Sequence, residues 1–480
     1  MSRLLRGSCA FASLLALAFL AWHAARAVGF PFPLDYGEGP LLEQARILAA
    51  GGAIYRPTFT GYPFTIGNYP PVFPLLLAVG TKLFGLTYVT GRAVTTLATA
   101  ACVALVAAIV HTATRDRWAS LAGAAAFAAS PYVVFWSSLV RVDFVALSFS
   151  LCAVLLVARR PEWRACPFAA GGLVVLAVMT RQTHLLAAPL AIGGFFLAAR
   201  GWRRALGFVV TVAVGTMAAV GTLELITGGG FLVNTVKANM NHFSFPLLAH
   251  FMGDFAVTSA LLYGIAAFTA ARRLREGGTK ELLLPLYLLG ASLSALTIGK
   301  VGSHVNYLLE VSAAISILGG VAVAGVKAQD AAWQRVALPA LVSLQIVWLT
   351  GLAALRPENI ESKLGQRGEY EKLTRALAET RGDVLADEAM GMLVITGHPI
   401  LLQPFEFTQL AREHVWDETP VVTDLKAGRF ALVLINDGPS TPAAWTRDRW
   451  TADMLAAVHE TYEPTDALAG ATLYRVKRPQ

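Results

Sequence analysis

The stretch Pro71-Val-Phe-Pro-Leu-Leu-Leu-Ala-Val-Gly-Thr-Lys-Leu-Phe-Gly85 decides how this chain is arranged, because it is strongly apolar and yet short. A helix that crosses the hydrocarbon core of a bilayer needs about 20 mostly apolar residues. These 15 residues fall short of that length and begin with a proline. The charges on the rest of the chain therefore determine whether the stretch crosses a membrane or lies along its surface.

The composition places most of the chain in a membrane. Of its 480 residues, 55% are hydrophobic and 15% are charged, against roughly 25% charged in an average soluble protein. This balance excludes a disordered chain or one that wraps nucleic acid, and it argues against an ordinary soluble enzyme. The net charge of +8 is uneven, because residues 356–480 hold 14 Lys and Arg against 19 Asp and Glu, while residues 1–355 hold 25 against 12. We predict a membrane domain over 1–355 and a soluble domain over 356–480.

Eleven other segments are apolar enough to be membrane helices. They are residues 8–28, 91–112, 118–137, 143–158, 166–180, 183–199, 205–227, 254–271, 281–298, 305–326 and 335–355. Basic residues cluster between them, at Arg3/Arg6, Arg115/Arg117, Arg159/Arg160/Arg164, Arg200/Arg203/Arg204, Arg272/Arg273/Arg275/Lys280 and Lys327/Arg335. The positive-inside rule places all these clusters in the cytoplasm, which requires that the stretch 71–85 does not cross. It then forms an outer surface or re-entrant helix within one long outer loop, residues 29–90.

The predicted fold class is thus an α-helical polytopic protein of the plasma (inner) membrane, with about 11 spans and a small C-terminal α/β domain. The N-terminus is cytoplasmic and the C-terminal domain extracytoplasmic. In that domain we predict helices over 367–380, 406–415 and 448–461, and strands over 383–387, 400–403, 431–436 and 472–476. Four scattered cysteines favour neither a zinc site nor a disulfide framework.

Acidic residues are the more informative charges of the membrane domain. Five of its twelve carboxylates fall among the cytoplasmic arginines: Asp116, Glu162, Glu276, Glu281 and Asp330. The other seven fall on the outer side: Asp35, Glu38, Glu43, Asp143, Glu224, Asp254 and Glu310. Because an ionisable group in or near hydrocarbon is costly, it usually marks function or a tight ion pair. Seven acids on one face predict a polar cavity that opens outward.

Two outer segments supply the candidate catalytic carboxylates. Asp35 and Glu38 lie in a turn rich in proline and glycine, and either is a candidate general base or metal ligand; the alternative is a helix-capping acid. Asp143 follows Arg141 at the outer start of a span, where it either faces the first pair across the cavity or forms a local ion pair.

Polar side chains in later outer segments are candidates for binding phosphate or a metal. Arg181 offers a planar donor fork for phosphate, although an arginine also reaches an interface simply by snorkelling. His242, in the loop 228–253, is a candidate metal or phosphate ligand, although a lone loop histidine is usually neither. Lys300, Asn306 and Tyr307 lie at the entrance of a span, and Glu310 one turn inside it needs a partner, so a structural role stays open.

In order along the chain, these segments resemble membrane glycosyltransferases of the GT-C fold, in particular the protein O-mannosyltransferase and aminoarabinose transferase families (glycosyltransferase family 39). The resemblance covers about residues 8–325. It is carried by Asp35-x-x-Glu38 with Ala45-Arg-Ile-Leu and Gly52-x-Ile-Tyr55; Asn68-Tyr-Pro-Pro71 with Leu83-Phe-Gly85 and Gly91-Arg92; Arg141-Val-Asp143; Met179-Thr-Arg-Gln-Thr183; and Gly302-Ser-His-Val-Asn-Tyr307.

The resemblance implies that a sugar is transferred, with inversion, from a polyprenyl-phosphate donor at the bilayer to an unidentified glycan, lipid or protein acceptor, without nucleic acid. It implies catalytic carboxylates at Asp35 and Asp143, and Glu38, in the same turn as Asp35, is the third catalytic candidate. The residues that remain to bind substrate and phosphate are Tyr69, Arg92, Arg141, Arg181, Lys300, Asn306 and Tyr307. The aminoarabinose transferases carry a metal-binding Glu-Lys-Pro where this chain has Asn68-Tyr69-Pro70. A divalent cation (Mg²⁺, Mn²⁺ or Zn²⁺), with His242 as a ligand, is therefore an open question.

Two other functions are compatible with the composition. A secondary transporter usually places charges near the bilayer midplane on paired repeats, whereas these acids lie at outer ends and no repeat is visible. The other alternative is a non-catalytic assembly or sensor protein, in which the C-terminal domain binds a ligand. We interpret Asp387, Glu388, Glu406, Asp417 and Glu418 in that domain as ordinary surface acids.

Overall fold

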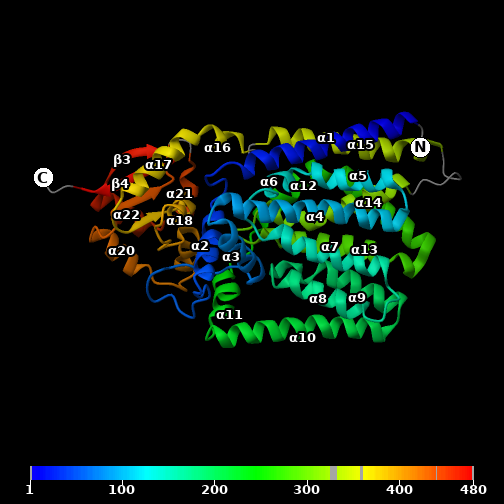
Figure 1. Ribbon diagram of the computed structural model, residues 1–480, viewed down its shortest axis with the longest axis horizontal. Helices are drawn as coiled ribbons and strands as arrows, with labels where there is room; N and C mark the ends of the chain where they lie inside the picture. The colour runs from blue at the N-terminus through cyan, green and yellow to red at the C-terminus, as the bar shows by residue number, and fades with distance from the viewer. Residues whose placement is uncertain (1–2, 325–331, 357–359, 439–440, 478–480) are drawn as a thin grey trace.

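The structure, a computed structural model, describes residues 3–324, 332–356, 360–438 and 441–477. Along its longest axis the molecule divides into a helix bundle and a smaller α/β domain, with the first and last described residues at opposite ends (Figure 1). Lys327 and Asp330, and the side chains of Arg3, Arg6 and Arg335, lie outside the described residues. The predicted cytoplasmic placement of these charges therefore stays a prediction.

The bundle consists of helices that run along the long axis. They are α1 (Arg3–Val28), α4 (Tyr88–Thr114), α5 (Arg117–Ala129), α6 (Pro131–Trp136), α7 (Asp143–Arg159), α8 (Cys166–Val178), α9 (Ala187–Ala199), α10 (Trp202–Ile226), α12 (Phe245–Gly277), α13 (Leu283–Ala295), α14 (Leu309–Ala324) and α15 (Ala332–Leu355). Short helices connect them: α2 (Glu38–Ala49), α3 (Val72–Phe84), α11 (Gly230–Thr235), η1 (Gln182–Leu185), η2 (Lys237–Asn239), η3 (Gly278–Glu281), η4 (Leu296–Gly299) and η5 (Val305–Leu308). Each of the eleven predicted segments overlaps at least one of these helices.

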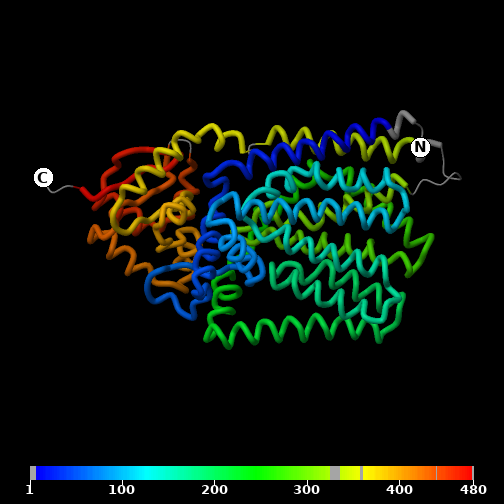
Figure 2. The backbone as a smooth tube through the Cα atoms, in the orientation of Figure 1, coloured from blue at the N-terminus to red at the C-terminus, as the bar shows by residue number. Residues whose placement is uncertain are grey.

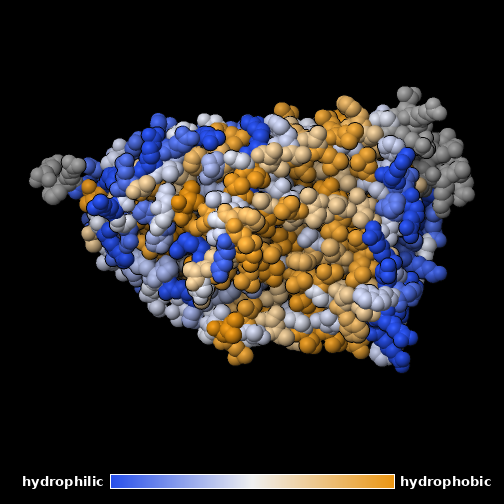
Figure 3. All heavy atoms as spheres, viewed as in Figure 1, coloured by the Kyte–Doolittle hydropathy of each residue, from blue (hydrophilic) through white to orange (hydrophobic). Residues whose placement is uncertain are grey.

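Seven helical segments of the described chain are long and apolar enough to cross a membrane, and the chain is a multi-pass membrane protein. On the face of the molecule seen in Figure 3, an apolar band covers the bundle between a hydrophilic end and the mixed surface of the C-terminal domain. Shorter helices such as α8 and α13 complete the bundle. The total of eleven spans stays a prediction.

Helix α14 forms the centre of the bundle, because it packs against α4, α5, α12 and α13. Its contact with α5 is close, since a Cβ atom added at Gly320 would lie 2.9 Å from the Ala119 carbonyl oxygen. Small residues at such crossings let two membrane helices approach closely. At one edge of the bundle, α1 and α15 run side by side (Figure 2), and α15 leads into the C-terminal domain.

The stretch 71–85 forms α3, which packs beside α2 at the end of the bundle that faces the C-terminal domain (Figure 1). One face of α3 buries Phe73 and Leu77, while Val79 and Leu83 on another face are 57% and 68% exposed. A helix of 13 residues with an exposed apolar face suits a position along a lipid surface.

The C-terminal domain is a four-stranded sheet with helices. Its elements are α16 (Glu361–Gly365), α17 (Arg367–Glu379), β1 (Val384–Ala386), α18 (Met390–Ile395), α19 (Pro404–Arg412), α20 (Thr419–Lys426), β2 (Leu432–Ile435), α21 (Ala443–Arg449), α22 (Ala452–Thr461), β3 (Tyr462–Leu468) and β4 (Ala471–Val476). The strand order is β1-β2-β4-β3, in which β1 pairs parallel with β2 and the other pairs are antiparallel. The register places Val384 opposite Leu432 and Val433 opposite Tyr474.

One predicted strand is wrong. Residues 400–403 do not join the sheet; Leu402 instead forms an isolated parallel bridge with Phe64 of the first outer loop. Phe64 and Ile66 are buried in the same hydrophobic cluster as Phe407, Trp416 and other core residues of the C-terminal domain. The first outer loop therefore completes the core of that domain and joins it to the bundle.

Candidate active site

Glu38 and Arg92 form a fully buried ion pair beneath the first outer loop, with both side chains 0% exposed. Arg92 donates to both Glu38 oxygens, at 2.8 and 2.7 Å, and to the carbonyl oxygens of Ala27, Phe30 and Phe32. Glu38 also accepts hydrogen bonds from the backbone N–H groups of Leu34, Asp35 and Val140. Both side chains spend their hydrogen bonds on each other and on backbone groups of Ala27, the first outer loop and Val140. The pair therefore fixes the conformation of that loop.

Asp35 bonds to Arg141, so that the first and second outer segments meet. The carboxylate also accepts a hydrogen bond from the Gly37 N–H at 2.8 Å. The two side chains are 18% and 12% exposed, which leaves the pair at the surface of the site. Burial opposes ionisation of Asp35, but Arg141, followed by His304 and Lys363, more than offsets it and lowers the pKa of the carboxyl below its usual value. Asp35 is therefore ionised at neutral pH.

Asp143, the first residue of α7, is buried and held from three directions. It accepts hydrogen bonds from Trp136 Nε1 at 2.5 Å and Asn306 Nδ2 at 3.0 Å, and it forms an ion pair with Arg181. Arg181 in turn lies 4.5 Å from the centre of the Tyr307 ring. The predicted residues Asp143, Arg181, Asn306 and Tyr307 are thus brought together.

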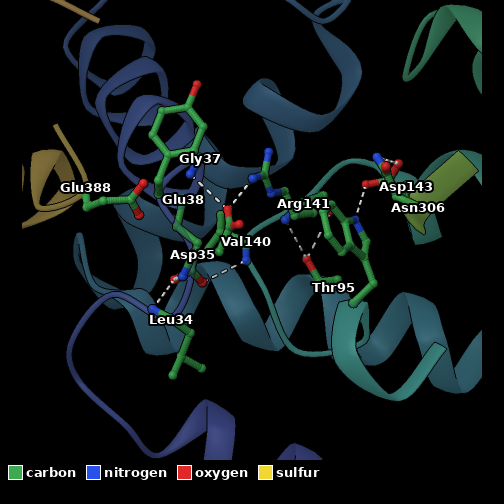
Figure 4. A network of polar contacts seen from close by, with 12 residues as sticks. Leu34, Asp35, Gly37, Glu38, Thr95, Val140, Arg141, Asp143, Asn306 and Glu388 are labelled. Atoms are coloured by element: carbon green, nitrogen blue, oxygen red, sulfur yellow. Dashed lines mark hydrogen bonds and ion pairs between the residues drawn. The ribbon is translucent and has the colours of Figure 1, made fainter. Parts of the chain in front are cut away.

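Arg141 and Trp136 link the two carboxylates. The Arg141 guanidinium lies 5.1 Å from the centre of the Trp136 ring, whose N–H bonds to Asp143. Figure 4 shows Asp35 and Arg141 on one side of this connection and Asp143 with Asn306 on the other. Trp136 was not a predicted site residue, and no pattern around it in the sequence indicates this role.

Tyr69 and Lys300 lie close to this cluster. Burial raises the pKa of the Tyr69 hydroxyl, with Arg141, Asp143 and Arg181 as its charged neighbours. Lys300 donates to Asn239 Oδ1 at 3.3 Å, and burial lowers the pKa of its ammonium group. The predicted residues Glu38 and Arg92 are directed away from this cluster, into their own pair.

A second polar group lies deeper in the bundle. Glu310 on α14 accepts hydrogen bonds from Ser150 at 2.8 Å and Tyr287 at 3.3 Å, and its carboxylate lies 3.4 Å from His184 Nδ1. His184 and Glu310 line a small cavity together with Asp143, Arg181 and Asn306. Glu310 therefore has the partner that its burial requires, and His184 is a site residue that the sequence analysis missed.

His242 lies apart from the carboxylates. It is exposed and lies 3.5 Å from Glu413 of the C-terminal domain. Within the described residues, no three His, Cys, Asp or Glu side chains form a group that could hold a metal ion.

The interpretation of the C-terminal acids as surface residues is wrong for three of them. Asp387 is 1% exposed and accepts hydrogen bonds from Trp450 Nε1 at 3.0 Å and the Asn436 N–H at 2.9 Å. Glu388 forms an ion pair with Arg449, and Glu406 accepts a hydrogen bond from Tyr36. The Asp387 and Glu388 contacts depend on how the C-terminal domain folds, and the Glu406 contact depends on how that domain docks on the first outer loop; local sequence patterns indicate neither.

The helix bundle with its C-terminal domain has the GT-C fold, and the matches to solved structures and to a family model confirm the resemblance that the motifs indicate. ArnT from Cupriavidus metallidurans, solved with undecaprenyl phosphate, has a TM-score of 0.68 at 14% identity over 96% of this chain and 97% of that chain. AglB, the oligosaccharyltransferase of Archaeoglobus fulgidus, solved with an inhibitory peptide and a dolichol-phosphate, has a TM-score of 0.59 at 12% identity over 99% and 74%.

Further matches are consistent with this class. The arabinofuranosyltransferase AftD from mycobacteria has a TM-score of 0.53 at 15% identity over 100% of this chain and 40% of that chain. In sequence, residues 68–225 match the family model described as dolichyl-phosphate-mannose-protein mannosyltransferase. No curated protein sequence matches the chain.

Proposed function

We propose that the protein transfers a sugar from a polyprenyl-phosphate-linked donor to an acceptor at the outer face of the plasma membrane. The observation that carries this proposal is the link between Asp35 and Asp143 through Arg141 and Trp136. This link brings two carboxylates and an arginine together at the end of the bundle that faces the C-terminal domain. The family match over residues 68–225 and the lipid phosphates bound by ArnT and AglB support the same class of donor.

The cationic side chains Arg181 and Lys300 are assigned to the sugar donor. Displacement of a phosphate from the anomeric carbon leaves negative charge on that phosphate, which pre-arranged donors stabilise. Arg181 lies against Tyr307 with Asn306 beside it, and Lys300 lies in the neighbouring outer turn. We assign these residues, with Tyr69, to the phosphate and the donor sugar.

The acceptor side is assigned to Asp35. An acceptor hydroxyl needs a nearby base to take its proton as the new bond forms. Asp35 is ionised and partly exposed, and Arg141 fixes its direction. A single carboxylate on the attacking side, without a covalent intermediate, corresponds to inversion. We assign Asp143 to holding Arg181 in place, and Glu38 with Arg92 to positioning the Asp35 loop.

The described residues do not form a metal site. A structure of the A. fulgidus enzyme contains zinc and sulfate, but in this chain His242 has Glu413 as its acidic neighbour and lies in no group of three ligands. We therefore assign no step to a metal ion. Arg181 and Lys300 are assigned to stabilise the negative charge of the phosphate.

The experiment incubates membranes that contain the protein with a panel of polyprenyl-phosphate sugars, with and without EDTA. Transfer of label from at least one donor, lost in Asp35→Asn and Asp143→Asn, supports the proposal. Failure to transfer from any donor contradicts it, and uptake of a solute by sealed vesicles would favour a transporter instead.

A further inference from the structure

Tyr36 extends from the first outer loop to the C-terminal domain, whereas its neighbour Asp35 bonds to the bundle. The Tyr36 hydroxyl donates to Glu406 on α19, and its ring meets the Phe405 ring edge to face at 6.2 Å between ring centres. The Arg449 guanidinium lies 5.5 Å from the Tyr36 ring centre and pairs with Glu388. The consecutive residues Asp35 and Tyr36 therefore contact the bundle and the C-terminal domain, respectively, at the same position of the first outer loop.

Several buried polar atoms around Tyr36 have no hydrogen-bond partner among the described residues. They are Arg141 Nε, Arg449 Nε and Glu406 Oε2. Arg141 and Arg449 both act electrostatically on Tyr36 and on Glu406, so these groups surround one small region. Buried donors and acceptors are nearly always satisfied by protein, water or a ligand. Two open N–H donors and one open carboxylate oxygen, beside an aromatic ring, therefore point to a bound molecule.

The charges of this region select the chemistry of that molecule. A simple anion would meet the carboxylates of Asp35, Glu388 and Glu406, and a simple cation would meet the guanidinium groups of Arg141 and Arg449. An uncharged polyol avoids both conflicts, because each hydroxyl both donates and accepts. One hydroxyl can donate to Glu406 Oε2 while others accept from the two guanidinium groups, and the apolar face of a sugar ring suits the Tyr36 ring.

We propose that Tyr36, Glu406, Arg449 and Arg141 form a sugar-binding subsite that the first outer loop and the C-terminal domain build together. The subsite rests on the proposed function, since the sugar that it binds belongs either to the donor or to a glycan acceptor. It gives the C-terminal domain a direct part in substrate recognition.

The test uses the full chain in lipid nanodiscs and a panel of methyl glycosides as probes, with binding followed by saturation-transfer NMR. At least one glycoside is expected to bind the wild type, with dissociation constants about tenfold higher in Glu406→Gln and in Tyr36→Phe. Glu371→Gln, an exposed glutamate on α17, is the matched control and is expected to bind as the wild type does. Tyr36→Phe keeps the aromatic ring and removes only the hydroxyl. If Glu406→Gln fails to fold, glycoside binding by Tyr36→Phe still tests the proposal.

The proposal is overturned if no glycoside binds the wild type, or if both variants bind as well as Glu371→Gln does. Displacement of the glycoside by a polyprenyl-phosphate sugar assigns the subsite to the donor, and simultaneous binding assigns it to the acceptor. Sugar transfer without glycoside binding contradicts the subsite alone, whereas glycoside binding without transfer from any donor contradicts the proposed function alone.

Discussion

Arg141 holds the carboxylate of Asp35 across 106 positions of sequence, and this ion pair joins the first outer loop to the second. The same guanidinium lies over Trp136, which bonds to Asp143. A single arginine therefore connects the proposed base to the side of the site where the donor phosphate is assigned. Substitutions around this connection should affect the chemistry and the fold in different ways.

Arg141→Met is expected to shift the pH dependence of transfer. Arg141 lowers the pKa of Asp35 in the wild type, so its removal lets burial raise that pKa. Because the proposed base must be ionised, the acid limb of the rate profile should move to higher pH, by about 1 unit or more. Initial rates measured from pH 4 to pH 8 test this, with Arg367→Met on exposed α17 as the control. If the acid limb of the rate profile does not move in Arg141→Met, Arg141 does not lower the pKa of the catalytic base.

Glu38→Gln and Arg92→Met are expected to destabilise the fold. Each leaves a buried partner uncompensated, which typically costs about 3–5 kcal/mol, whereas the exposed Arg367–Glu371 pair should matter little. Thermal unfolding in detergent measures the difference. The double variant Glu38→Leu/Arg92→Leu should be less destabilised than the sum of the single variants. Additive effects would show that the two side chains do not act as a pair.

Gly391→Ala is expected to disturb the docking of the C-terminal domain. A Cβ atom at Gly391 would lie 1.9 Å from the Tyr88 hydroxyl oxygen, and one at Gly39 would lie 2.5 Å from the Gly391 nitrogen. Because α18 packs on α2 beside the Asp35 turn, the variant should lose about 1–3 kcal/mol of stability and exchange the amides of residues 38–49 faster. Gly368→Ala, which meets no atom within 4 Å, is the control. If the amides of residues 38–49 exchange equally fast in Gly391→Ala and Gly368→Ala, α18 does not pack on α2 as described.

The buried carboxyl of Asp387 is expected to make the stability of the fold depend on pH. Burial, with a contribution from Glu388, raises the pKa of its carboxyl from 3.8 to about 6. Because the folded state holds this proton more tightly than the unfolded state, the stabilising contribution is full below about pH 4 and is lost as the pH rises through about 6. The melting temperature of the wild type minus that of Asp387→Asn should therefore be larger at pH 5 than at pH 8. A difference that does not change with pH would contradict the raised pKa.

The bundle could be predicted because membrane helices depend on local composition and flanking charge. The short length of residues 71–85 and the arginine clusters indicated a surface helix, and α3 has the exposed apolar face that such a helix needs. The sequence placed Asp143, Arg181 and Asn306 on one predicted side of the membrane, and the three side chains lie together at one end of the bundle. The pairing of Glu38 with Arg92 could not be predicted, because it depends on how α2 packs on α4.

The C-terminal domain was predicted less completely. Alternating or buried apolar runs indicated β1, β2 and β4, but residues 400–403 pair with Phe64 of a distant loop. Tyr36 and Glu406 are 370 positions apart, and only the docking of the two domains brings them into contact. Long-range docking of this kind leaves no periodic pattern in the sequence.

The central claim is that Asp35 is the base for sugar transfer, and its most direct test is the rate of transfer by Asp35→Asn in reconstituted vesicles with a polyprenyl-phosphate sugar. Loss of the base is expected to lower the rate by a factor on the order of 10² to 10⁴, with unchanged unfolding temperature and with Asp417→Asn, an exposed residue, as active as the wild type. Transfer by Asp35→Asn at the wild-type rate would contradict the account.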